Sequence, residues 1–241
     1  RKLTVFGCLE DALYRLFKQS VQCVPCGRTD TGVHADLSYC HCDFPFQFDP
    51  ADITLSLNKA LSSVGIRINS IAVVPPTFHA LSSATTRTYH YYFTFDQSLP
   101  AYMFHSVTVL YNEPLFIPGE DALQSLFVGR KNFMSLCNRS ADTKTFIREI
   151  HDIRFFEQPY VSLSGDEMTI YCFQITANGF LYKMVRHIVG LLLHSMVNFT
   201  NIGRLNDYFL IHRPVSYSLA PVQGLHLAQV NYNKVTKVVR K

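Results

Sequence analysis

The feature that most restricts the fold is an apolar stretch, residues 184–197, that carries an arginine near its start. Its sequence is MVRHIVGLLLHSMV, and Arg186, His187 and His194 interrupt it. It therefore lacks the roughly 20 uninterrupted apolar residues of a membrane span. We expect a buried helix and no membrane association. Because a buried arginine needs an anionic partner, the rest of the fold has to supply one.

The helix is also expected to carry a narrow polar stripe on an otherwise apolar surface. Helical spacing groups five residues on that stripe: Lys183, Arg186, His187, Gly190 and His194. The candidate partner for the arginine is Asp30, in the segment GRTDTGVHA.

Apolar periodicity elsewhere predicts a mixture of helices and strands. The predicted helices are 6–18, 50–61, 120–127 and a long one beginning near Gly179. The predicted strands are 21–25, 37–44, 66–74, 84–95, 146–156, 168–176 and 225–232. Strict βαβ alternation is missing, so the preferred class is α+β with largely antiparallel sheets.

Composition bounds the chemistry only loosely. A chain of 241 residues with 48% hydrophobic and 17% charged residues has the profile of a compact protein and not of a disordered one. The net charge of +4 permits a polyanionic partner without requiring one. Seven scattered cysteines, without a leading signal sequence, favour a reducing cytosol over a disulfide framework.

Two familiar interpretations of GRTDTGVHA fail on its own residues. Gly27 and Gly32 are spaced as in a phosphate-binding loop, but Val33 and His34 replace the lysine and hydroxyl residue that bind phosphate and magnesium. The DTG triplet at Asp30 is typical of aspartic proteases, in which two carboxylates share a proton. Only one such triplet occurs here, and a neighbouring arginine would hold its carboxylate ionised.

The remaining interpretation makes Asp30 a lone ionised carboxylate on a tight turn that Gly32 permits. Such a group can act as a nucleophile or as an electrostatic stabiliser. An aspartate that bonds its own turn explains the same local sequence. The segment alone leaves both alternatives open.

A second candidate region is the aromatic strand at residues 84–95. Its period of two places Arg87, Tyr89, Tyr91 and Phe93 on one face. A cation with stacking rings suits an extruded nucleobase. A half-buried aromatic strand with one extended arginine explains the pattern equally well.

The cysteines suggest a zinc site that we do not favour at this point. Cys23 and Cys26 would face opposite ways in an extended strand, and Cys40 and Cys42 lack the usual knuckle spacing. The sequence therefore predicts no bound metal.

These motifs together resemble the TruA-type tRNA pseudouridine synthases, whose GRTDxGVHA pattern the segment at residues 27–35 matches. Further matches follow in family order through nearly the whole chain. They are Leu57-Asn58, Phe78-His79-Ala80, Arg87-x-Tyr89-x-Tyr91, Gly179-Phe180-Leu181, residues 184–190 and Ala220-Pro221-x-x-Gly224-Leu225.

The resemblance implies a cytoplasmic enzyme that isomerises uridine to pseudouridine in the tRNA anticodon stem-loop, at tRNA positions 38 to 40, without cofactor or metal. It implies that Asp30 is the catalytic carboxylate, that Tyr89 contacts the uracil and takes its C5 proton, and that Arg186 pairs with Asp30. The candidate substrate-binding residues are Arg28, Thr29, His34, His79, Arg87 and Lys183.

The resemblance implies a chain built from two ferredoxin-like halves that share a largely antiparallel sheet beside a basic cleft. It also implies that two such chains form a homodimer. We place these halves at 1–105 and 106–241, and the opening strand of the family is missing before the first helix.

The chain departs from the family at positions that border the RNA path: Leu81, Leu37-Ser38 and His187. These departures leave two alternatives to an enzyme, a tRNA-binding chaperone with the same fold and a zinc-stabilised structural module.

Overall fold

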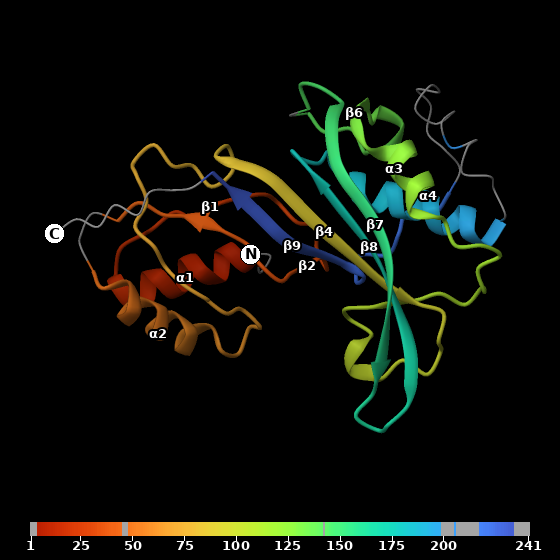
Figure 1. Ribbon diagram of the computed structural model, residues 1–241. Helices are drawn as coiled ribbons and strands as arrows, with labels where there is room; N and C mark the ends of the chain where they lie inside the picture. The colour runs from red at the N-terminus through yellow and green to blue at the C-terminus, as the bar shows by residue number, and fades with distance from the viewer. Residues whose placement is uncertain (1–3, 45–47, 142, 199–204, 206–216, 234–241) are drawn as a thin grey trace. The chain divides into compact units, whose positions relative to one another are not determined.

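The computed structural model describes residues 4–44, 48–141, 143–198, 205 and 217–233 (Figure 1). The chain divides into two compact units. The first unit comprises residues 1–28, 38–84 and 232–241, and the second comprises 29–37 and 85–231. The Asp30 segment and nearly all of the aromatic strand belong to the second unit. The halves at 1–105 and 106–241 stay a prediction.

Two capped helices form most of the first unit. α1 (Val5–Phe17) begins after Thr4, whose hydroxyl accepts the Gly7 N–H at 3.0 Å. α2 (Pro50–Leu61) begins after Asp49, whose carboxylate accepts the Ala51 N–H at 2.8 Å. Such caps satisfy backbone donors that have no partner within the helix. Both predicted helices are thus confirmed to within one residue.

The strands of the first unit are shorter than expected. β1 (Val24–Pro25) pairs antiparallel with β3 (Cys40–His41), where the sequence predicted strands at 21–25 and 37–44. Cys40 of β3, with Cys23 and Cys42 next to the two strands, packs in a core that includes Leu9, Leu13, Ile53, Leu57 and Leu61.

The predicted strand at 66–74 is wrong. These residues have no strand pairing in the structure. Instead, the Asn58 amide side chain binds both backbone groups of Ile68, accepting its N–H at 2.7 Å and donating to its carbonyl at 2.8 Å. The asparagine side chain thus satisfies the backbone of Ile68 without a neighbouring strand.

The second unit is built on a seven-stranded sheet (Figure 1). Its strands are β2 (His34–Ala35), β9 (Leu225–Tyr232), β4 (Ala84–Thr94), β8 (Glu167–Ala177), β7 (Ile147–Val161) and β6 (Gly129–Asn132) in spatial order, with β5 (Thr108–Val109) beside β4. β2 with β9 and β4 with β5 are parallel pairs, whereas β4–β8, β8–β7 and β7–β6 are antiparallel. The predicted α+β class with a largely antiparallel sheet is confirmed.

Two helices, α3 (Glu120–Phe127) and α4 (Met184–Asn198), cover one face of this sheet (Figure 1). Short 3-10 turns, Ala101–Met103 and Met134–Leu136, lie in the connections. α4 is the apolar stretch of the sequence, and it begins five residues later than the predicted Gly179. Among the described residues, no helix has both the length and the apolar character needed to cross a bilayer.

Glycine allows an irregular segment, residues 217–224, to lie directly on α4. A Cβ added at Gly190 would stand 2.5 Å from the Ser218 carbonyl oxygen and 3.0 Å from the Ala220 nitrogen. At the far end of the segment, a Cβ at Gly224 would meet the Tyr92 carbonyl oxygen at 2.5 Å. Backbone therefore packs on backbone at both positions, which only glycine permits.

We predict that Gly190→Ala destabilises the protein. Alanine favours a helix by about 1 kcal/mol over glycine, but a backbone clash of this kind costs more, so we expect a net loss of about 1–3 kcal/mol. The midpoint of urea unfolding measures the loss. Gly179→Ala is the matched control, because an added Cβ meets nothing within 4 Å there. Equal midpoints for the two variants would contradict the close packing.

Candidate active site

Asp30 lies on a tight turn of the second unit. The Val33 N–H donates to the Asp30 carbonyl oxygen at 3.1 Å, and Gly32 has a φ of +89°. Only glycine adopts this φ without strain. A Cβ at Gly32 would also stand 2.8 Å from a methyl carbon of Val222. The glycine is needed both for the shape of the turn and for the packing beneath it.

The carboxylate of Asp30 meets the arginine of the buried helix. Arg186 Nη1 lies 3.2 Å from Asp30 Oδ2. The two side chains are 12% and 23% exposed, respectively. The structure therefore contains the anionic partner that the sequence required for Arg186.

A second contact fixes the orientation of the guanidinium group. Arg186 Nε donates to the Ala220 carbonyl oxygen at 2.8 Å, while the Ala220 N–H donates to the Arg186 carbonyl oxygen at 3.2 Å. This reciprocal pair depends on the close approach of the 217–224 segment to α4. The arginine thus stabilises the carboxylate from a position that the backbone defines.

The start of α4 carries further polar contacts. Lys183 has a φ of 61°, which is uncommon for a residue with a side chain, and its carbonyl oxygen accepts the His187 N–H at 3.0 Å. The His187 ring bonds the Tyr217 hydroxyl at 3.0 Å and Asn138 Oδ1 at 2.7 Å. Burial, with added repulsion from Arg186 and Lys183, lowers the pKa of His187. The ring therefore favours the neutral form as a hydrogen-bonding bridge.

The aromatic face of β4 divides into an accessible end and a buried end. Arg87 and Tyr89 are partly exposed, whereas Tyr91 and Phe93 are fully buried in the core. Burial raises the pKa of Tyr91, and its hydroxyl bonds Thr108 Oγ1 at 2.9 Å. Tyr89 is partly exposed, and its ring meets the Phe180 ring edge to face at 5.1 Å. Of the two tyrosines, only Tyr89 suits a contact with a ligand.

A small basic hollow lies at the Arg87 end of β4. Arg87 Nη1 approaches the Asn178 carbonyl oxygen at 3.5 Å, and Asn178 lines a hollow of about 280 Å³. Arg130 and Arg148 line the same hollow, together with Glu149. Two guanidinium groups beside one carboxylate give it a net positive lining.

The histidines predicted to bind substrate have structural contacts. His34, in β2, donates from Nε2 to the His105 carbonyl oxygen and stacks on His226 at 4.8 Å. In the first unit, His79 Nδ1 accepts the backbone N–H groups of Leu81 at 3.2 Å and Ser82 at 3.4 Å. The His79 ring therefore helps to hold its own loop, and the His34 ring joins β2 to His105 and to His226 of β9.

The other predicted binding residues are at the surface. Arg28 and Thr29 are exposed, and Lys183 Nζ lies 5.0 Å from the centre of the Tyr182 ring. The structure brings Asp30 and Arg186 into contact, and it places Tyr89 and Arg87 on one face of β4. The binding roles of all six substrate-binding candidates stay predictions.

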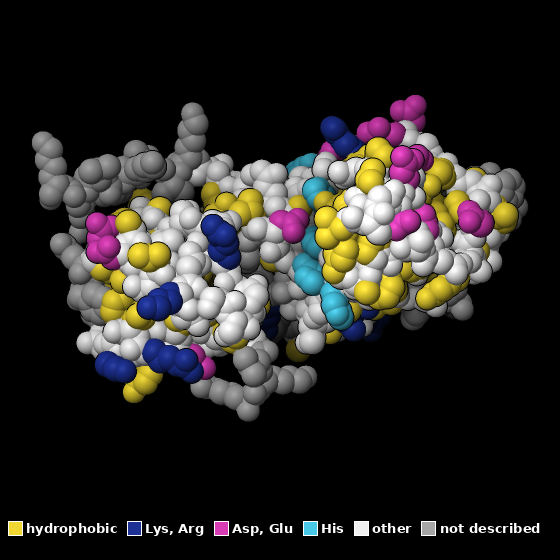
Figure 2. Space-filling view, turned by 90° about the horizontal axis from the view of Figure 1, so that it is seen from below, with side chains coloured by type: hydrophobic (Ala, Val, Ile, Leu, Met, Phe, Trp, Pro, Cys, Tyr) yellow, Lys and Arg dark blue, Asp and Glu magenta, His cyan; other side chains and the backbone are white. Residues whose placement is uncertain are grey.

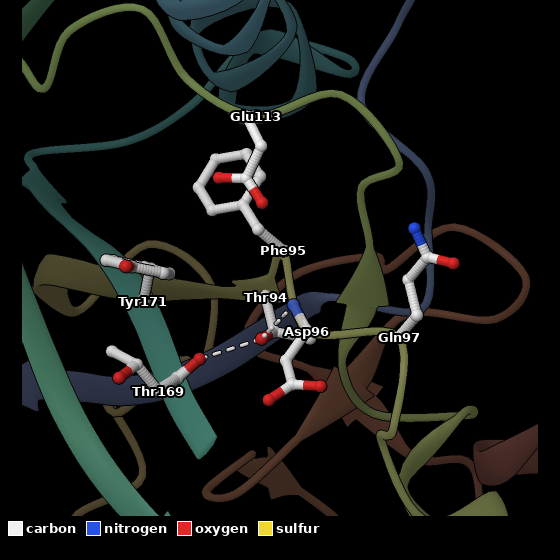
Figure 3. A pocket seen from close by; sticks show the side chains of 7 residues that line it. All are labelled: Thr94, Phe95, Asp96, Gln97, Glu113, Thr169 and Tyr171. Carbon is white, nitrogen blue, oxygen red and sulfur yellow. Dashed lines mark hydrogen bonds between the residues drawn. The ribbon is translucent and has the colours of Figure 1, made fainter.

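A larger hollow, of about 420 Å³, lies at the opposite end of β4 (Figure 3). Asp96 and Glu113 give it an acidic lining, and Thr94 Oγ1 donates to the Thr169 carbonyl oxygen within it at 2.7 Å. None of the predicted site residues lines this hollow. Its acidic side chains also make it a poor place for a polyanion.

Charge on the visible surface is dispersed. Figure 2 shows the lysine and arginine side chains of the described residues in small separate groups.

Sequence reasoning missed the Ala220 carbonyl, which orients Arg186, and the roles of Phe180 and Asn138. The carbonyl left no side-chain signal, because any residue can supply it. The only residue in the sequence that indicated this contact was Gly190, because a glycine in a helix allows another backbone segment to approach closely.

Comparison with known proteins identifies the family. A family model described as tRNA pseudouridine synthase matches residues 123–233. The tRNA pseudouridine synthase A of Caldicellulosiruptor saccharolyticus is 32% identical over 243 aligned positions, which cover 96% of this chain and 91% of the relative.

Two further relatives agree. The tRNA pseudouridine synthase A 1 of Bacillus cereus is 30% identical, covering 95% of this chain and 90% of the relative. The tRNA pseudouridine synthase A of Halalkalibacterium halodurans is 34% identical, covering 79% of this chain and 68% of the relative. With the matching sequence extending across nearly the whole chain, this protein belongs to the tRNA pseudouridine synthase family.

Proposed function

We propose that this protein isomerises uridine to pseudouridine in the anticodon stem-loop of tRNA, with Asp30 as the catalytic carboxylate. Membership of its family makes the chain an isomerase that acts on tRNA. The observation that carries the finer proposal is the ion pair between Asp30 and Arg186. In this pair, Arg186 balances the charge of the Asp30 carboxylate, which is partly exposed and lies on the turn that contains Gly32.

The reaction needs few protein groups. The bond between uracil N1 and the ribose C1′ breaks, the ring turns, and a bond forms between C5 and C1′. The C5 proton leaves, and N1 gains a proton, so the product is an isomer of the substrate. Asp30 can serve this exchange at the sugar or at the uracil ring, while Arg186 balances its negative charge before and after the step.

Tyr89 is the group we propose to contact the uracil and accept its C5 proton. Phe180 holds the Tyr89 ring by an edge-to-face contact, so that the phenol keeps a defined direction. A flipped base can stack on such a ring. This arrangement supports a role in both binding and proton transfer.

Cations around the strand end are proposed to hold the RNA backbone. Arg87, Arg130 and Arg148 lie at or beside the small basic hollow. Guanidinium groups bind phosphate oxygens bidentately, which positions the nucleic acid without reading its sequence. Arg28, Thr29, His34, His79 and Lys183 complete the proposed binding residues. We also propose that the enzyme works as a homodimer in the cytoplasm.

Replacing the carboxylate should abolish turnover. Asp30→Asn keeps the side-chain volume and removes the charge, so we expect tritium release from tRNA labelled at uracil C5 to fall at least about 10³-fold. Binding of tRNA, measured by filter retention, should change by less than about threefold. Asp96→Asn, in the acidic hollow, is the matched control and should keep full activity.

Retained tritium release in Asp30→Asn would refute the assignment. Binding without release by the unaltered protein would select a tRNA-binding chaperone instead. A tRNA transcript without uridines in its anticodon arm tests the site of modification. Continued release from it would place the reaction elsewhere in the tRNA.

Arg186→Lys separates charge from orientation. Lysine keeps a positive charge near Asp30, but it cannot bond the carboxylate and the Ala220 carbonyl as a guanidinium does. We expect kcat to fall about 10- to 100-fold with little change in KM. Lys59→Arg, at an exposed position of α2, is the control for a change from one basic residue to the other. A rise confined to KM would assign Arg186 to substrate binding alone.

Tyr89 can be dissected by a pair of variants. Tyr89→Phe keeps the ring and removes the hydroxyl, so release of the C5 proton should slow by about 10²- to 10⁴-fold while tRNA binding persists. Tyr89→Leu also removes the stacking surface and should weaken binding by about 1–3 kcal/mol. Single-turnover tritium release and filter binding measure the two effects. Full activity in Tyr89→Phe would exclude the hydroxyl as the base.

A further inference from the structure

The first unit contains a group of three cysteines that the proposed reaction does not use. The sulfur atoms of Cys23, Cys40 and Cys42 all lie within 4.8 Å of one another. Cys42 Sγ lies 3.2 Å from Cys23 Sγ. Cys23 is buried and the other two are partly buried.

Strand pairing brings these residues together. β1 and β3 pair with Val24 opposite His41 and Pro25 opposite Cys40. The same antiparallel register, continued by one residue, places Cys23 opposite Cys42. Because side chains alternate along a strand, Cys40 and Cys42 face the same side of the pair. Three thiols thus converge from two strands with no change in the backbone.

Cys26 is not part of this group. Its sulfur approaches Ser38 Oγ at 3.7 Å and accepts the Tyr39 N–H at 3.4 Å. One ground of the sequence argument against a metal was that Cys23 and Cys26 would face opposite ways; the other was the unusual spacing of Cys40 and Cys42. The structure removes the first objection, because Cys40 and Cys42 supply the other two sulfurs.

We propose that Cys23, Cys40 and Cys42 bind a zinc ion that joins β1 to β3. In a tetrahedral site with Zn–S bonds of about 2.3 Å, two sulfurs stand about 3.8 Å apart. The observed limits, 3.2 Å for the Cys23–Cys42 pair and 4.8 Å for the group, bracket that separation. Small side-chain rotations therefore suffice to form the site.

A water or the Glu10 carboxylate completes the coordination. Glu10, in α1, accepts the Cys23 N–H with Oε1 at 2.9 Å, which keeps its carboxylate beside the group. A structural zinc site usually has four protein ligands, and a carboxylate oxygen can be one of them. Participation of Glu10 would link α1 to both strands.

Zinc at this site would stabilise the short sheet formed by β1 and β3. β1 and β3 have two residues each, too few to be stable by pairing alone. They also flank the segment that carries Asp30, since Cys23 precedes it by seven residues and Cys40 follows it by ten. Zinc would fix the distance between the two strands that precede and follow this segment. The proposal does not depend on the identity of the reaction.

Metal content of the full-length protein tests the proposal. After addition of Zn²⁺ and dialysis against metal-free buffer, mass spectrometry of the metal should find about one zinc per chain. Cys42→Ser and Cys40→Ser should each retain far less. Cys172→Ser is the matched control, because Cys172 is buried in the second unit and should leave the zinc content unchanged.

Cobalt binding by the unaltered protein tests the site even if a cysteine variant fails to fold. Co²⁺ bound by the unaltered protein should show the intense charge-transfer absorption of thiolate ligation, and added Zn²⁺ should abolish it. Dialysed protein with less than about 0.1 zinc per chain and no such absorption would overturn the proposal. A Cys23–Cys42 disulfide, seen as the loss of two hydrogens in the unreduced mass, would overturn it in favour of oxidation.

Discussion

The contact between Arg186 and Asp30 is the constraint on which the second unit depends. An arginine at the start of a largely buried helix is costly unless a carboxylate balances its charge. Asp30 supplies that charge from a turn more than 150 positions away in the chain. The helix, the turn and the segment at residues 217–224 therefore have to be in register for any of them to be stable.

Backbone packing enforces that register. Gly190 lets the segment touch α4, and the Ala220 carbonyl then reaches the guanidinium of Arg186. Gly32 performs a similar task, because its turn packs against Val222 of the same segment. The site is thus positioned by two glycines that carry no chemistry themselves. This explains how a largely apolar unit can fix the geometry of a charged pair.

The two units contain different polar clusters. In the second unit, the His187 ring bonds the Tyr217 hydroxyl and the Asn138 side chain. In the first unit, three thiols converge across two very short strands. The first arrangement is satisfied within the protein, whereas the second has the ligand set of a metal site. Our zinc proposal follows from that contrast.

The sequence by itself determined the class of the fold, the two helices of the first unit, the apolar helix and its need for an anionic partner, because periodicity and charge are local properties. It failed at residues 66–74, where no strand forms and the Asn58 side chain bonds the backbone of Ile68. It also did not distinguish the partly exposed Tyr89 from the buried Tyr91 on the same face of β4. Tertiary structure alone decided which tyrosine stays accessible, which carbonyl orients Arg186 and which cysteines meet. Each depends on the pairing of segments distant in the chain, and a one-residue shift in that register would reverse which side chains face each other.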